Sequence, residues 1–340
     1  MNIAVDVMGT DHGPEQIILG AVQATEEYGC TVYLVGDKDI IEELLSKNNY
    51  LVGEKIKIEH AGEVIEMTEH PGIAIRKKKD ASILVATRLA KNGTCDAVVS
   101  PGSTGAAAAA ALVVLGRING IERATIATPI PNMFGTTVVL DSGANVDSKP
   151  QHLEQSALMG YIYAENVLNI NNPKVGLLSI GEEETKGNEQ TVLTHQLLKK
   201  HKQINFIGNV EGRDITNGTV DVVVCDGFVG NIVLKLAEGL AKTIFQLLKN
   251  TIDKSGIFAK FGAFLLMPTL RKLKTKMDAA EYGGAPLLGV NKEFIICHGS
   301  SGAKAIKNAV RVAIEFKESG AISIIKEKLT VNDAVNNIDL

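Results

Sequence analysis

The sequence predicts an α/β protein in which a mostly parallel β-sheet is flanked by helices. The first 60 residues alternate between short apolar runs and amphipathic stretches, a rhythm typical of parallel sheets. The unbroken apolar run from Val222 to Cys225 fits a strand that is buried on both faces. The 33 glycines and an aromatic content of only 4% suit a chain with many tight turns between strands and helices.

The composition excludes several classes of protein. A net charge of −4 argues against general nucleic-acid binding. The four cysteines are widely spaced, so we expect neither a metal site nor a disulfide framework, and no cofactor motif is present. No run approaches the roughly 20 apolar residues of a membrane span, and the chain enters its first strand without a signal sequence. We therefore expect a soluble, cytoplasmic protein.

The first candidate site residues follow the first strand. Strands are expected at residues 3–7, 31–36 and 56–60, with helices at 14–28 and 37–47. Asp6 and Gly9 then lie at or just beyond the carboxyl end of a strand, where open α/β sheets bind ligands. Further on, four consecutive cations from Arg76 to Lys79 form either a solvated face or a contact with an anion.

A glycine-rich loop connects the strand expected at 97–100 to a helix of small residues at 106–115. Ser103, Thr104 and Gly105 offer hydroxyl groups and close backbone approach, which suits a phosphate or an oxyanion. The loop lacks the lysine and the spacing of a P-loop, so an ordinary turn is an equal alternative.

Two further strand ends carry polar residues. The strand expected at 136–140 leads to Asn145, and a helix is expected at 150–166. The strand expected at 174–181 leads to three consecutive acids and Lys186. Because consecutive residues point in different directions, we expect a turn or a helix start there and no metal cluster, with Lys186 as the residue of interest.

The stretch from Val220 to Gly239 is predicted to be a strand, a loop and a helix. Gly227 and Gly230 are expected to form a tight turn, and Asn231 to cap the helix. Asp226 and Asn231 are the first candidates for catalysis, because an exposed helix start presents N–H groups to an anion. The alternative is an ordinary turn followed by a cap.

Residues 254–276 contain no acid and combine apolar residues with cations. The apolar residues include Ile257, Phe258, Phe261, Phe264 and Leu265, and the cations include Arg271, Lys272 and Lys274. The apolar residues largely share one helical face, which predicts a protruding pair of amphipathic helices, broken at Pro268, on an anionic membrane. The alternative is a core or dimer helix.

The last candidate loop follows the strand expected at 293–298. His298 ends that strand, and Ser300 and Ser301 precede a helix that begins near residue 303. A single histidine is usually structural, but this one is expected to face the same crevice as the other strand-end loops. Loops rich in N–H groups and hydroxyls suit a phosphate or a developing oxyanion. Since no covalent nucleophile is evident, we expect one bound substrate to attack another directly.

Seven motifs, in order along the chain, resemble the phosphate acyltransferase family of bacterial phospholipid synthesis. They are Asp6-Val-Met-Gly9, Met67-Thr-Glu-His-Pro71, Ser100-Pro-Gly-Ser-Thr-Gly105, Asp141-Ser-Gly-Ala-Asn145, Cys225-Asp-Gly-Phe-Val-Gly-Asn231, Glu281-Tyr-Gly-Gly-Ala-Pro-Leu-Leu-Gly289 and His298-Gly-Ser-Ser301. The resemblance extends to about residue 328. It implies one two-lobed acyltransferase domain at residues 1–329, which includes the amphipathic segment at 250–278, and a tail at 330–340.

The resemblance implies a fold like those of isopropylmalate dehydrogenase and phosphate acetyltransferase, and a homodimer. It also implies that inorganic phosphate attacks the thioester of a long-chain acyl carrier protein, which gives acyl phosphate and free carrier protein. A membrane glycerol-3-phosphate acyltransferase would then use the acyl phosphate, so peripheral contact with an anionic membrane surface makes physical sense. A dehydrogenase of similar fold and a non-catalytic membrane scaffold are the alternatives.

The resemblance also suggests roles for the candidate residues. Ser103, Thr104 and Gly105 would bind phosphate or the thioester oxygen, and Lys186 would neutralise charge. Asn231 would position a base that is either Asp226 or His298. The other residues that we expect to bind substrate are Asp6, Gly9, Asn145, Ser300 and Ser301. Arg76, Lys78 and the basic helices would contact the acidic carrier protein.

Overall fold

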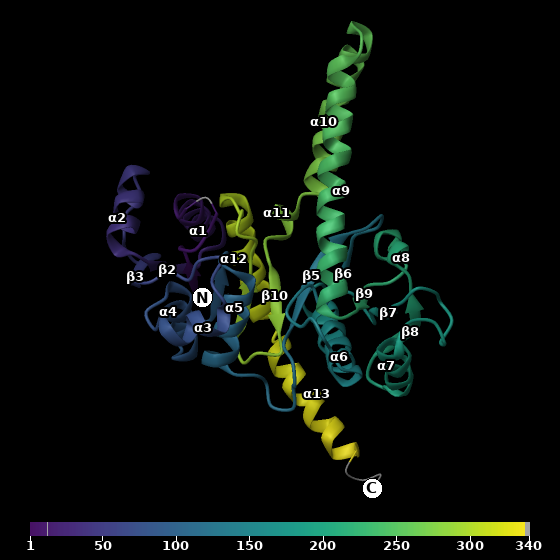
Figure 1. The fold of residues 1–340 in the computed structure, drawn as a ribbon. Coiled ribbons are helices and arrows are strands. Elements are labelled where there is room, and N and C mark those ends of the chain that lie inside the picture. Colours follow the sequence, from purple (N-terminus) through teal and green to yellow (C-terminus); the bar gives the residue numbers. More distant parts are fainter. Residues whose placement is uncertain (12, 337–340) are drawn as a thin grey trace.

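A single twisted sheet runs through the body of the molecule, with helices on both faces (Figure 1). The computed structural model describes residues 1–11 and 13–336, and within them the sheet has eleven strands in the order β3-β2-β1-β4-β11-β10-β5-β6-β9-β7-β8. The strands are β1 (Asn2–Asp6), β2 (Thr31–Gly36), β3 (Ile56–His60), β4 (Ala97–Ser100), β5 (Thr125–Pro131), β6 (Thr136–Leu140), β7 (Lys174–Leu178), β8 (Asn205–Val210), β9 (Val222–Val224), β10 (Ala285–Leu288) and β11 (Glu293–Ile296).

Seven of the ten strand pairings in this part of the chain are parallel, in agreement with the predicted mostly parallel sheet. The three antiparallel pairings lie together at the centre of the sheet: β10 with β11, β10 with β5, and β5 with β6. Strands β1, β4 and β11 therefore run in one direction, and β6, β9 and β7 in the other. The expectation that all strand-end loops face one crevice is wrong for this reason.

Helices cover both faces of the sheet. They are α1 (Glu15–Tyr28), α2 (Lys38–Lys47), α3 (Pro71–Lys77), α4 (Ser82–Lys91), α5 (Thr104–Ala110), the π-helix Ala111–Leu115, α6 (Pro150–Asn166), α7 (Glu189–Lys200), α8 (Gly212–Asn217), α9 (Gly227–Lys254), α10 (Ile257–Lys276), α11 (Ala279–Tyr282), α12 (Ala303–Glu318) and α13 (Ala321–Asn336). In β1, Ile3 and Val5 pack into the cluster that contains α1, α6 and α12, while Ala4 packs into the cluster that contains α4 and α5. Such central strands are buried on both faces, as expected for a parallel sheet.

Several elements have the predicted bounds, and the start of α9 does not. Strands β2, β3, β4 and β6 and helix α6 match the prediction. Helix α9 begins at Gly227, so Asn231 lies inside its first turns and is not the cap. The cap is Asp226, whose Oδ1 accepts a hydrogen bond from the N–H of Val229 at 2.9 Å. Asp226 directly precedes the first free N–H groups of the helix, and its carboxylate accepts a hydrogen bond from one of them. Asn231 lies too far along the chain to do the same.

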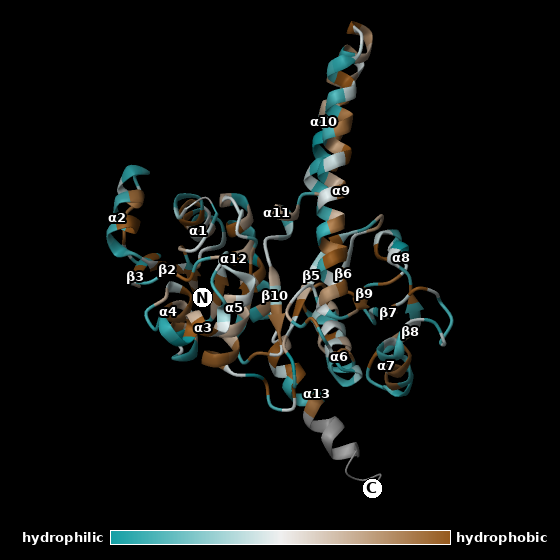
Figure 2. Cartoon of the chain, in the orientation of Figure 1, coloured by the Kyte–Doolittle hydropathy of each residue, from teal (hydrophilic) through white to brown (hydrophobic). Residues whose placement is uncertain are grey.

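Helices α9 and α10 form a hairpin that projects away from the body, with hydrophobic residues along both helices (Figures 1 and 2). The turn between them lies at Ser255 and Gly256, and α10 continues through Pro268, so the predicted break at this proline is wrong. Phe258 is 91% exposed and Ile257 is 79% exposed. Among the described residues, no helix combines the length and the apolar character that crossing a membrane requires.

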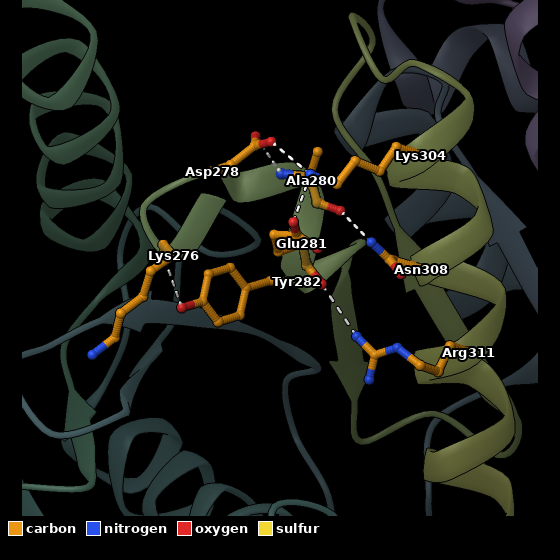
Figure 3. Close-up of polar contacts among 8 residues, drawn as sticks. All are labelled: Lys276, Asp278, Ala280, Glu281, Tyr282, Lys304, Asn308 and Arg311. Atoms are coloured by element: carbon orange, nitrogen blue, oxygen red, sulfur yellow. Dashed lines mark hydrogen bonds and ion pairs between the residues drawn. The ribbon is translucent and has the colours of Figure 1, made fainter. Parts of the chain in front are cut away.

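Helix α11 fastens the end of this hairpin to α12 (Figure 3). The ammonium of Lys304 pairs with Asp278 at 3.1 Å and with Glu281 at 2.6 Å. The side chain of Asn308 donates to the carbonyl of Ala280 at 2.8 Å. The base of the hairpin therefore rests on the helix that follows the His298 loop. The tail expected at 330–340 begins inside α13, and residues 337–340 lie outside the described residues.

Candidate active site

Two rims of the sheet carry the candidate residues. The first rim is formed by the carboxyl ends of β1, β4 and β11, and the second by those of β6, β9 and β7; within each group the strands are parallel neighbours. The first rim carries Asp6, Gly9, Ser103, Thr104, Gly105, His298, Ser300 and Ser301, and the second carries Asn145, Lys186, Asp226 and Asn231. Strands β4 and β6 lie four strand spacings apart, roughly 19 Å across the sheet. Because they run in opposite directions, their carboxyl ends also lie at opposite edges of the sheet.

Asp6 is the buried carboxylate of the first rim. Its Oδ2 accepts a hydrogen bond from the hydroxyl of Ser100 at 2.9 Å, and its Oδ1 accepts one from the N–H of Met8 at 3.3 Å. Burial raises the pKa of Asp6 to about 6, against the opposing effect of hydrogen bonds from Ser82 and Ser100. A pocket of about 10 Å³, enough for one water molecule, lies beside Asp6, Gly9 and Ser82.

The loop before α5 lies next to this pocket. Ser103 is half-buried and lines the pocket, whereas Thr104 and Gly105 are exposed at the start of α5. A Cβ on Gly105 would lie 2.8 Å from Pro71, so α3 and α5 begin side by side. Thr104 is thus exposed to solvent beside the start of α3, whose basic residues Arg76 and Lys77 lie in its last turn.

His298 is exposed and makes local contacts on the same rim. Its Nδ1 accepts a hydrogen bond from the N–H of Ser300 at 3.2 Å and lies 2.8 Å from the hydroxyl of that residue. A backbone N–H can only donate, so in the neutral imidazole the proton is on Nε2. The outward nitrogen of neutral His298 is therefore a hydrogen-bond donor and not a base. Ser301 is buried behind it, and its N–H donates to the carbonyl of His298 at 2.9 Å.

On the second rim, the carboxylate of Asp141 fixes the loop that follows β6. It accepts hydrogen bonds from the N–H groups of Gly143, Ala144 and Asn145 at 3.1, 3.0 and 2.8 Å. It also accepts from the side chain of Asn145 at 2.8 Å and from the N–H of Ile126 at 3.1 Å. Burial raises the pKa of Asp141, and these donors oppose the rise. In the sequence, Asp141 stands only as the first residue of one family motif and is not among the candidate site residues, although an aspartate that starts such a loop is typical of an Asx-turn.

Helix α9 docks on this loop through two glycines. The N–H of Gly227 donates to the carbonyl of Asn145 at 2.7 Å, and a Cβ on Gly230 would lie 1.8 Å from the carbonyl oxygen of Asp141. These glycines are needed for close approach of two backbones and do not form the predicted turn. The exposed side chain of Asn231 lies over Gly143, within 4 Å of the position that a Cβ would take there.

Lys186 lies in the exposed loop that follows β7. Its N–H donates to the carbonyl of Glu183 at 3.0 Å, and its carbonyl accepts from the hydroxyl of Ser179 at 3.1 Å. The backbone of this lysine is thus fixed at both ends while its side chain remains exposed. The second rim therefore combines a cation, two amides and the carboxylate of Asp226.

No hydrogen bond between described residues joins the candidate residues of the two rims. Ala144 of the second rim nevertheless packs against the apolar cluster that contains Ala106 and Ala107 of α5. Of the two basic residues assigned to a partner contact, Arg76 is exposed, whereas the ammonium of Lys78 is bound by Glu69 at 2.6 Å and by the carbonyl of Val64 at 2.6 Å. The described residues also contain no cluster of His, Cys, Asp and Glu that is arranged for a metal ion.

Two solved structures have folds similar to that of this chain. A phosphotransacetylase from Streptococcus pyogenes matches with a TM-score of 0.66 and 17% identity, over 93% of this chain and 94% of that one. A 4-hydroxythreonine-4-phosphate dehydrogenase from Klebsiella pneumoniae matches with a TM-score of 0.54 and 12% identity, over 93% and 99%. At these identities the likeness concerns the fold alone. It confirms the predicted fold class.

Sequence relatives and one family model match this chain over nearly its whole length. A phosphate acyltransferase from Pelotomaculum thermopropionicum is 53% identical over 99% of this chain and 98% of its own length. Another, from Desulfitobacterium hafniense, is 56% identical over 97% of this chain and 98% of its own length. The model of a family described as fatty acid synthesis protein matches residues 1–324. With these matches over nearly its whole length, the chain belongs to the fatty acid synthesis protein family.

Proposed function

We infer that this chain is a phosphate acyltransferase of lipid synthesis, which transfers a long-chain acyl group from the thioester of an acyl carrier protein to inorganic phosphate. Its family and its phosphate acyltransferase relatives support the reaction. One structural observation supports the location: three neighbouring parallel strands, β6, β9 and β7, end in loops that carry Asn145, Asp226 and Lys186. The reaction centre is assigned to this second rim.

The proposed reaction is a direct displacement. An oxygen of HPO₄²⁻ forms a bond to the carbonyl carbon of the thioester, and the carbon–sulfur bond then breaks. The products are acyl phosphate and carrier protein, whose sulfur receives the proton that the phosphate has lost. Lys186 offsets the negative charge of the phosphate, and the amides of Asn145 and Asn231 orient it. Asp226 holds the transferred proton between the two steps.

The choice of Asp226 over His298 as the base follows from their hydrogen bonds. Neutral His298 has its proton on the outward nitrogen, as argued above from the donor at Ser300. Asp226 uses Oδ1 to cap α9, and Oδ2 accepts no hydrogen bond from any described residue. Asp226 therefore has a free acceptor, whereas His298 has none.

The first rim is assigned to the remote part of the acyl carrier protein substrate. Ser103, Thr104 and Gly105 do not share a phosphate with Lys186, because β4 lies four or more strand positions from β6 and β7 and runs in the opposite direction. An acyl carrier protein presents its thioester on a long flexible arm, so contacts along that arm can lie far from the reacting carbon. Asp6, Gly9, Ser300 and Ser301 belong to this arm-binding region. Arg76, in the last turn of α3, would contact the acidic carrier protein itself.

The hairpin is assigned to assembly and to the membrane. Apolar residues along α9 and α10 are exposed, and cations at Arg271, Lys272 and Lys274 lie on α10. We assign the stripe on α9 to a homodimer contact and the tip of the hairpin to an anionic membrane surface, where a glycerol-3-phosphate acyltransferase would take up the acyl phosphate. The protein would then be cytoplasmic and peripherally membrane-associated.

The proposed reaction is tested by release of free carrier-protein thiol from palmitoyl carrier protein, with and without phosphate. Asp226→Asn should reduce phosphate-dependent turnover by about 100-fold or more. Asparagine caps helices as well as aspartate does, so the fold should remain and the loss isolates the carboxylate. The matched control is Asp37→Asn, the same change at the N-cap of α2, which should leave turnover unchanged. Wild-type turnover in Asp226→Asn would reject Asp226, and release that is independent of phosphate would reject the reaction.

A further inference from the structure

Two buried polar side chains near the outer edge of the sheet have no part in the reaction proposed above. His195 on α7 is 4% exposed and Asn209 on β8 is 6% exposed. Nδ1 of His195 lies 2.9 Å from Oδ1 of Asn209. Burying two such groups costs free energy unless each finds hydrogen-bond partners. Both find them, and the partners lead to the loop that carries Lys186.

The orientation of the Asn209 amide is fixed by its second partner. Its Nδ2 donates to the carbonyl of Glu183 at 2.8 Å. A carbonyl can only accept, so Nδ2 must face Glu183 and Oδ1 must face His195. His195 then donates from a protonated Nδ1. On the opposite side of the imidazole, Nε2 lies 3.8 Å from a carboxylate oxygen of Glu184, beyond hydrogen-bond distance, and that carboxylate pairs with Lys199 at 2.6 Å.

The carbonyl of Glu183 is the point where this network meets Lys186. It accepts hydrogen bonds both from Asn209 and, at 3.0 Å, from the N–H of Lys186, which closes the turn from Glu183 to Lys186. The hydroxyl of Ser179 fixes the carbonyl of Lys186 at 3.1 Å. The position of the Lys186 backbone thus depends on one buried amide and one hydroxyl.

We propose that Asn209, oriented by His195, is a positioning residue for the acyl transfer, which holds the turn from Glu183 to Lys186 so that the Lys186 ammonium stays at the second rim. This rests on the role of Lys186 in the proposed function. The long side chain of lysine has many conformers, and a loose backbone would spread its ammonium over a wide volume. Displacement of a charge by about 1 Å can cost a large factor in rate.

The test is a double-mutant cycle on the full chain, with turnover and KM for phosphate measured by thiol release from palmitoyl carrier protein. Asn209→Leu, which removes both hydrogen bonds at similar volume, should lower kcat/KM for phosphate by about 10-fold to 100-fold. In a Lys186→Ala background the same change should have less than about a twofold effect, because the group that it positions is gone. An equal loss in both backgrounds would overturn the proposal.

Two further variants distinguish loss of Lys186 positioning from a general disturbance of the packing around α7. Ser179→Ala removes the other anchor at a half-exposed position and should show the same dependence on Lys186, with a smaller loss. Thr194→Val removes a buried hydroxyl on α7 that, among the described residues, bonds to the carbonyl of Gln190 in the same helix, and it should leave turnover unchanged. A Thr194→Val loss that matched that of Asn209→Leu would show that α7 packing is the cause and would overturn the proposal.

Trypsin gives a readout that does not depend on activity. The bond after Lys186 is a trypsin site in an exposed loop, and its cleavage in the native protein reports how often the turn opens. Asn209→Leu should speed this cut by about 10-fold relative to cuts elsewhere. An unchanged rate would overturn the proposal. Wild-type turnover in Lys186→Ala would instead reject the role of Lys186 in the proposed function, while the cleavage rate alone would still decide whether Asn209 holds the turn.

Discussion

At the residue scale, Gly230 shows how little room separates α9 from the loop after β6. A Cβ at this position would lie 1.8 Å from the carbonyl oxygen of Asp141, a backbone atom that cannot move aside cheaply. Gly230→Ala should therefore lower the free energy of unfolding by about 3 kcal/mol and reduce turnover, because α9 and the Asn145 loop must separate. Denaturant unfolding and thiol release measure the two effects.

Gly239 on the same helix is the matched control. No atom lies within 4 Å of the position that its Cβ would take. Gly239→Ala should raise the free energy of unfolding by about 0.5–1 kcal/mol through helix propensity alone. Equal effects of the two substitutions would show that close approach is not why glycine occupies position 230.

Asp6 gives a pH dependence at the same scale. Its pKa is about 6 in the folded protein against 3.8 for an ordinary aspartate carboxyl, so the folded state holds the proton more tightly than the unfolded state. Stability from this group is complete below pH 4 and is lost as the pH rises to about 6, a loss of about 3 kcal/mol. Asp6→Asn should be more stable than the wild type at pH 7, with the difference shrinking toward pH 4. Unfolding curves at both pH values measure it, and a difference that grows at low pH would contradict the raised pKa.

At the element scale, the sequence predicted the parallel strands well and missed the two that reverse the direction of the sheet. Val222 to Val224 lies in a strand buried on both faces, where an apolar run is enough to recognise it. Strands β5 and β10 contain Pro129, Pro131 and Pro286, and proline argues against a strand in any reading of local pattern. Their antiparallel pairing is what separates the two rims, so the placement of His298 relative to Asp226 could not be derived.

Contacts between residues far apart in the sequence could not be predicted for the site either. The second-rim residues Asn145, Lys186, Asp226 and Asn231 were identified because each follows a strand in sequence. The anchoring of Asn145 by Asp141 is local and could have been read as an Asx-turn. The bond from Asn209 to Glu183 spans 26 positions in sequence and depends on the register of β7 against β8, which no local pattern reveals.

The hairpin of α9 and α10 is predicted to bind an anionic membrane through its tip. If its tip contacts an anionic bilayer, the double variant Phe258→Ser, Phe261→Ser should lose binding to vesicles that contain anionic lipid, because each buried aromatic contributes about 2 kcal/mol. The control is Leu51→Ser, which changes a leucine that is 84% exposed on the body. Co-sedimentation with vesicles measures binding. If Leu51→Ser weakens binding as much as the double variant does, the hairpin is not the contact.

At the scale of the whole molecule, the proposed function assigns the chemistry to the second rim and recognition of the carrier protein to the first. The sheet changes direction between them, so the carboxyl ends of β4 and β6 lie at opposite edges as well as roughly 19 Å apart across the sheet. Binding energy from a remote part of a substrate can still serve the reaction, because it positions the reacting group. Substrates with and without the carrier protein should therefore distinguish residues of the first rim from those of the second.

Palmitoyl carrier protein and palmitoyl pantetheine make this comparison directly. Arg76→Glu should raise KM for the carrier-protein substrate by about 10-fold, an effect that weakens with salt, and should leave turnover of the pantetheine substrate unchanged. Lys186→Ala should impair both substrates, because phosphate is common to them. Lys200→Glu, the same change of charge at an exposed lysine at the end of α7, is the control for net charge. If Arg76→Glu slowed the two substrates equally, the basic end of α3 would belong to the reaction centre, and the division between the rims would be wrong.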